Sequence, residues 1–155
     1  MSREVLPRPA KRQYEAKVFS DKQLLDLTSR VVGRIRALQA QYKQDEEKAI
    51  TGLMTANYDP KMPPDEMRKQ AANRQQAFMQ NEQQLRLNYE QAFRSSVIGD
   101  AAYCRRELLA RVGGDSFLQP RERTKSIAID GIMAGPDPIG DAADYLDALA
   151  KKLAP

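Results

Sequence analysis

The chain has 155 residues and a formal net charge of +4, with no histidine, no tryptophan and a single cysteine. The missing histidines exclude Ser-His and Cys-His catalytic pairs and histidine metal ligands, and a lone cysteine excludes an internal disulfide and a cysteine-based metal site. We therefore predict a protein that is not an enzyme and that has no catalytic, cofactor-binding or metal-binding residues and no cofactor.

The positive charge is concentrated at the N-terminus, where residues 1–20 carry five bases against two acids. Two prolines and few apolar residues predict a flexible basic arm over 1–18, followed by a single helical domain over 19–155. No stretch is apolar enough to span a membrane, and no apolar run follows the first bases as in a secretory signal. We expect no membrane contact and a cytoplasmic location.

The first long helix is predicted over about 20–57. Ser20 and Gln23 have capping-box spacing, and Tyr58-Asp59-Pro60 stops the helix. Its apolar residues recur at steps of three or four, as an amphipathic helix requires. They are Leu24, Leu27, Val31, Ile35, Leu38 and Tyr42.

The second long helix is predicted over 64–112, either continuous or hinged at Gly99. Pro63 and Pro64, followed by Asp65 and Glu66, favour its N-terminus, and Gly113-Gly114 favour its end. The short, proline-rich link predicts that the two helices are antiparallel neighbours. We do not expect a long regular coiled coil, because polar residues occupy expected core positions of the heptad. They are Arg74, Asn81 and Asn88.

Folding the pair about this link places residue i opposite about residue 123 − i, with an error of several residues. Leu38 then faces Leu85, while the segments near the turn are polar on both helices, so we expect a firm base and a weakly packed arm. In this register the second helix passes beyond the start of the first. Tyr103, Leu108, Leu109 and Val112 then need cover.

The last 40 residues supply that cover as two short helices packed at the base of the hairpin. One starts at Gln119-Pro120 and ends at Gly135-Pro136, with a short strand around Ser126–Ile129 as the alternative. The other starts at Asp137-Pro138 or at Asp141 and is amphipathic to Leu153. The predicted fold is all-α: a long antiparallel helical hairpin with two short C-terminal helices.

Such a fold without catalytic groups favours a protein–protein interaction protein, either an adaptor or a small structural subunit of a larger assembly. The partner is another protein or a second copy. Candidate contacts are methionines at the turn and leucines at the base, unless these fill the protein's own core. They are Met54, Met62, Met67, Leu108, Leu109, Val112, Leu146, Leu149 and Leu153.

The alternative is a nucleic-acid-associated protein that uses the basic N-terminal arm. Phosphate groups attract lysine and arginine side chains, and a short basic strap can order on such a partner. The predicted phosphate contacts are Arg8, Lys11, Arg12 and Lys17.

Overall fold

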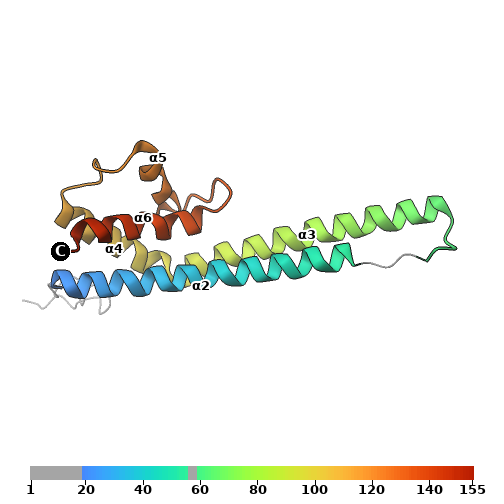
Figure 1. Ribbon diagram of the computed structural model, residues 1–155, viewed down its shortest axis with the longest axis horizontal. Helices are drawn as coiled ribbons and strands as arrows, with labels where there is room; N and C mark the ends of the chain where they lie inside the picture. Colours follow the sequence, from blue (N-terminus) through green and yellow to red (C-terminus); the bar gives the residue numbers. More distant parts are fainter. Residues whose placement is uncertain (1–18, 56–58) are drawn as a thin grey trace, which may run out of the picture.

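The computed structural model describes residues 19–55 and 59–155, and it confirms the all-α hairpin. These residues contain no strand. Two long helices lie side by side, and the C-terminal segments pack at one end of them (Figure 1). In order, the elements are α2 (Asp21–Met54), α3 (Pro64–Ser96), α4 (Ile98–Val112), α5 (Pro120–Arg123), the 3₁₀ helix η1 (Thr124–Asp130) and α6 (Pro138–Leu153).

The helix ends follow local side-chain chemistry. The Ser20 hydroxyl accepts a hydrogen bond from the backbone amide of Gln23 at 3.1 Å, and the Gln23 side chain accepts one from the backbone amide of Ser20 at 2.9 Å. The predicted capping box is therefore confirmed. The first helix ends at Met54, three residues before the predicted end. Gly113 ends α4 with a φ of 79°, which glycine adopts without a Cβ penalty.

The second long helix is interrupted, but at Val97 and not at Gly99. Val97 has φ −127° and ψ −34°, and α4 begins directly after it. The Ser96 hydroxyl donates to the Ala92 carbonyl at 2.6 Å, and the Arg34 guanidinium donates to the Ser96 carbonyl. Serine hydroxyls that bond back to the preceding turn bend helices, which explains a break that glycine alone does not produce.

The first C-terminal helix is shorter than predicted. Gln119 and Glu122 form a capping box, but the α-helix ends at Arg123 and continues as η1 to Asp130. The Thr124 hydroxyl donates to the Arg121 carbonyl and the Ser126 hydroxyl to the Arg123 carbonyl, both three residues back. Hydroxyls that compete in this way for backbone acceptors favour short, tight turns over an extended α-helix.

The predicted pairing register is wrong by about two helical turns. Tyr42 stacks on Tyr89 with ring centroids 4.8 Å apart, whereas the predicted register placed it opposite Asn81. At the other end, Arg111 reaches Asp21 at 3.0 Å, so α4 does not pass beyond the start of α2. It is α3 that extends past the end of α2 at the turn (Figure 1).

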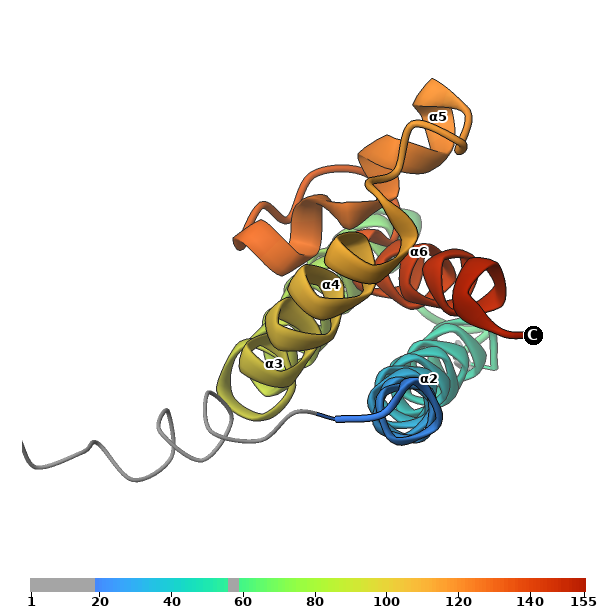
Figure 2. The same cartoon turned by 90° about the vertical axis from the view of Figure 1, so that its left-hand side faces the viewer.

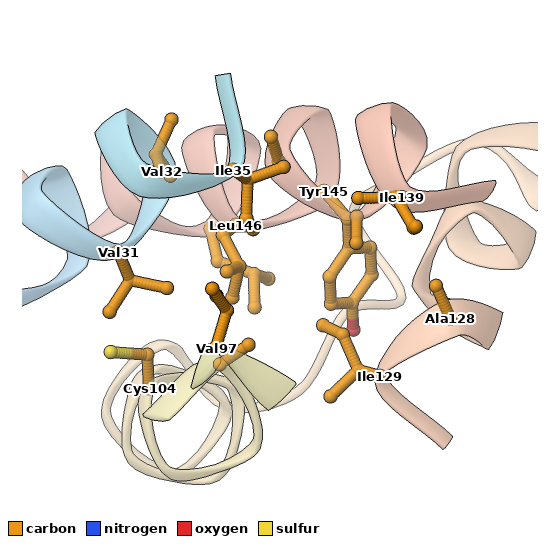
Figure 3. Packing of buried hydrophobic residues seen from close by; sticks show 14 of the residues in the cluster. Val31, Val32, Ile35, Val97, Cys104, Ala128, Ile129, Ile139, Tyr145 and Leu146 are labelled. Atoms are coloured by element: carbon orange, nitrogen blue, oxygen red, sulfur yellow. The ribbon is translucent and has the colours of Figure 1, made fainter. Parts of the chain in front are cut away.

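The core lies entirely at the base, where α2, α4, η1 and α6 meet and α3 ends. Figure 3 shows Val31 and Ile35 of α2, Cys104 of α4 and Leu146 of α6 in this core, together with Val97 from the break between α3 and α4. The buried side chains of α3 are Tyr89 and Phe93. α6 covers the core with one face, as predicted, and most of the buried residues of this helix are apolar.

We call residues 40–54 of α2 and 64–85 of α3 the arm. No described residue of the arm is buried, and the last buried residue of α2 is Ile35. Little apolar area is therefore removed from water along the arm, as the polar sequence near the turn predicts. The stability of the fold comes from the base, and the arm projects from it.

Candidate interaction surface

Two hollows lie between α2 and α3, and we call the seam that holds them the groove. The one near the turn has a volume of about 430 Å³, and the one nearer the base has a volume of about 110 Å³. The large hollow is lined by Ala49, Gly52, Leu53, Arg74, Ala77, Phe78 and Asn81. The small one is lined by Leu38, Gln41, Tyr42, Asp45, Leu85, Asn88, Tyr89 and Ala92.

Residue size and polarity explain why the groove is open. Gly52 contributes no side chain, and a Cβ built there would have no neighbour within 4 Å. Ala49 and Ala77 contribute one carbon each, while Asn81 keeps a polar amide in the seam. A close-packed interior leaves few voids of this size, so this seam is not packed like the core of a folded domain.

The groove was not predicted from the sequence as a site. Its signal was present in the polar residues at expected heptad core positions, Arg74, Asn81 and Asn88, all of which line it. We interpreted them as a departure from coiled-coil packing. They lie at heptad positions that face the other helix, and the space between the helices at these positions is not filled by side chains.

The root of the arm is fixed by one carboxylate. Asp137, the N-cap of α6, accepts hydrogen bonds from the backbone amide of Gly140 at 2.9 Å, the Tyr89 hydroxyl at 2.9 Å and the side-chain amide of Gln39 at 2.6 Å. Three helices are therefore tied to one side chain. Burial and the hydrogen bond to Asp137 raise the pKa of the Tyr89 hydroxyl far above its usual value, so Tyr89 stays protonated and remains a donor.

Arg86 adds a second attachment beside this junction. Its guanidinium donates to the carbonyls of Gly135 at 2.8 Å and Pro136 at 3.0 Å, in the connection that leads into α6. It also pairs with Glu90 at 3.2 Å. The connection over residues 131–137 is thus held against α3. These bonds fix the position of α3 relative to the base where the arm begins.

The methionines predicted as partner contacts lie at the turn. The Met54 side chain is 79% exposed, while Met62 and Met67 are half-buried. Met67 lines a hollow of about 360 Å³ together with Pro64, Arg68 and Ala71. The structure therefore brings Met67 into a surface hollow where α3 extends past α2, and it leaves Met54 projecting into solvent.

The leucines predicted at the base lie mostly in the core. Leu108, Leu146 and Leu149 are completely buried, so they reach a partner only if the base opens. Leu109, Val112 and Leu153 are partly buried and pack against the same core. These six residues therefore have the alternative role given for them above, which is to fill the protein's own core.

Cys104 is packed as a structural residue. It is fully buried, and burial raises the pKa of its thiol to about 11, although a hydrogen bond with Thr28 acts in the opposite direction. A thiol with this pKa is almost entirely protonated at neutral pH and is a poor nucleophile. Among the described residues, no group of three or more Asp, Glu, Cys or His side chains is placed to hold a metal ion.

The predicted basic arm over 1–18, with Arg8, Lys11, Arg12 and Lys17, lies outside the described residues. Its contact with nucleic acid therefore stays a prediction. No helix in the described part of the chain is long and apolar enough to cross a membrane. Comparison with protein-family models, with curated proteins and with solved structures found no match.

Proposed function

We propose that this protein is a non-catalytic helical interaction protein, an adaptor or a small structural subunit of a cytoplasmic assembly, and that its arm binds another protein chain. The observation that carries the proposal is the hollow of about 430 Å³ between the two helices of the arm, none of whose lining residues is buried. Grooves between helices commonly receive the apolar side chains of a further helix.

The energetics of the arm support the same proposal. Two helices whose shared seam holds small and polar residues remove little apolar surface from water, and helices gain most of their stability from packing. The arm also exposes large apolar side chains at its surface. They are Ile50 at 40%, Met54 at 79% and Met79 at 63% exposed. A partner that covers them would stabilise the arm while it binds.

The absence of histidine supports a role without catalysis, because a general base would have to come from another side chain. The described carboxylates support it too, since several of them already serve structural bonds. Asp137 caps α6, Asp144 pairs with Arg36 and Lys125, and Asp130 pairs with Arg105 at 2.7 Å.

Photo-crosslinking in cells tests this proposal. A photoreactive residue replaces Gly52 in the groove, where added atoms meet open space, and in a second variant it replaces Ser116, an exposed residue at the base. We expect a discrete protein adduct from position 52 and little from position 116. If position 52 gives no protein adduct above the level of position 116, the arm is not a binding element.

A further inference from the structure

The most exposed methionines of the arm, Met54 and Met79, lie on the same side of it as α6. On α2, Met54 follows Arg36 by 18 residues, about five full turns, so the two share one face of the helix. On α3, Met79 precedes Arg86 by seven residues, about two turns, and shares its face. Arg36 donates to the Gly140 carbonyl of α6, and Arg86 donates to the connection that leads into α6. Both methionines therefore point to the side of the helix pair on which α6 lies.

Ile50 joins these methionines in one apolar surface. It precedes Met54 by about one turn of α2 and is 40% exposed, against 79% for Met54 and 63% for Met79. Because Tyr42 stacks on Tyr89, Met79 is level with the stretch of α2 between Ile50 and Met54. The three side chains therefore lie within roughly 6 Å of one another along the axis of the arm. We call Ile50, Met54 and Met79 the apolar surface.

No described element covers the apolar surface. At the base, α6 occupies this side of the molecule, where it packs over α2 and beside α4 (Figure 2). It begins at Pro138, and its N-cap Asp137 bonds to Gln39 and Tyr89 at the root of the arm. Ile50 lies roughly 16 Å beyond Gln39 along α2. The side that α6 buries at the base thus continues along the arm without a covering helix in the described part of the chain.

Charged side chains flank the apolar surface toward the base, and most of them are acidic. They are Glu46, Glu47 and Glu82, with Lys43. No ion pair within the described part of the chain involves any of these four residues, although Glu46 accepts a hydrogen bond from the Tyr42 hydroxyl at 3.3 Å. Burial raises the pKa of the Tyr42 hydroxyl, and the charges of Glu46 and Glu82 raise it further, while Arg86 acts in the opposite direction. Carboxylates of both helices therefore lie near Tyr42.

We propose that this side of the arm binds an amphipathic helix of another protein, which covers the apolar surface and carries lysine or arginine residues opposite Glu46 and Glu82. This inference rests on the proposed function, because it takes the arm as the binding element, and it names the chemistry of the partner. Three carboxylates against one amine make this side negative, and complementary charge steers and aligns a partner. A second copy that bound through the same side would bring like charges together.

The apolar surface is distinct from the hollow near the turn. Gly52, which lines the hollow, lies about 160° around α2 from Arg36, whereas Met54 shares the face of Arg36. Helices that bind in this way place apolar anchors three, four and seven residues apart, and these anchors fit between the rows of side chains on two neighbouring helices. The two sides of the arm can therefore be tested independently.

Photo-crosslinking from the full chain tests the surface. A photoreactive residue replaces Met79, and in the control it replaces Gln84, an exposed residue about 140° around α3 from Met79. We expect a protein adduct from position 79 and little from position 84. Mass spectrometry should place the adduct in a segment with apolar residues at helical spacing and with lysine or arginine within about one turn of the linked residue.

Charge reversal tests the complementarity. Glu46→Lys and Glu82→Lys should each lower the yield from position 79 about tenfold, whereas Asp26→Lys, the same change at an exposed residue of the base, should leave it unchanged. Glu46→Gln and Glu82→Gln keep the size of the side chain and should give smaller losses. A synthetic peptide of the linked segment should bind the full chain more weakly in about 0.5 M than in about 0.05 M NaCl, because salt screens exposed charges. Circular dichroism of each variant separates lost binding from lost folding.

Equal yields from positions 79 and 84, or a yield that stays unchanged in both folded lysine variants, overturn the proposal. A linked segment that is acidic, that comes from a second copy of the chain, or that is the chain's own residues 1–18 also overturns it, since each identifies a different occupant. The broader interaction function is judged separately at position 52. An adduct there without one at position 79 retains that function and removes the surface proposed here.

Discussion

The junction at Asp137 permits the sharpest test of how this fold is held together. Replacement by alanine removes the N-cap of α6, a loss of about 1 kcal/mol. It also removes the hydrogen bonds from Tyr89 and Gln39, at about 1 kcal/mol each, and leaves the hydroxyl of the nearly buried Tyr89 without its acceptor. We therefore expect Asp137→Ala to lower the free energy of unfolding by about 2–4 kcal/mol.

Urea unfolding followed by circular dichroism measures this loss. Asp141→Ala is the matched control, because Asp141 lies in the same first turn of α6 and its loss removes only a helix-dipole interaction of about 0.5 kcal/mol. Asp137→Asn keeps one oxygen acceptor and should lie between the two. If Asp137→Ala unfolds within about 0.5 kcal/mol of the Asp141→Ala variant, the junction does not stabilise the fold as argued.

A double-mutant cycle adds a second check on the junction. Because Tyr89→Phe removes the donor to the same carboxylate, its effect should shrink in the Asp137→Ala background. Gly140→Ala should also disturb the junction, since a Cβ there would collide with the Gln39 amide and the Asp137 carboxylate. Independent, additive effects of Asp137→Ala and Tyr89→Phe would contradict a shared hydrogen-bond network.

Three further predictions concern the core, the Cys104 thiol and the loss of stability at low pH. Leu146→Ala should cost about 2–5 kcal/mol of unfolding free energy in urea titration, while Met54→Ala, at a side chain 79% exposed, should stay within about 0.5 kcal/mol. Cys104 should not react with a thiol reagent in the native protein at pH 8 and should react at once in urea, because burial raises its pKa to about 11; rapid native labelling would contradict its packing. Burial alone would raise the pKa of Asp144, but Arg36 and Lys125 outweigh it and lower that pKa overall. A folded pKa below the unfolded one gives stability that is present above about pH 4 and lost as the pH falls through the folded value. Asp144→Asn should therefore unfold more easily at pH 7 and show a smaller further loss on acidification, whereas an unchanged acid limb would contradict the role of Arg36.

The sequence alone determined the class of the fold and most element ends. Those features depend on neighbouring residues: the capping box at Ser20, the prolines before α3, the glycines after α4 and the apolar spacing along each helix. The same local rules failed where two local signals compete. Gly99 was the obvious hinge, yet the break is at Val97, because the serine hydroxyls before it and Arg34 take part in the turn.

Tertiary structure decided the register, and with it the groove. The pairing of α2 with α3 is shifted by about two turns from the predicted register, so that α3 extends past α2 at the turn and α4 does not extend past α2 at the base. No local rule fixes this shift, because it depends on how α2, α4 and α6 fill the common core around Leu146 and Ile35. The polar residues at heptad positions were visible in the sequence. That they line an open seam depends on the packed base, which holds the two helices together at one end and leaves the space between them unfilled along the arm.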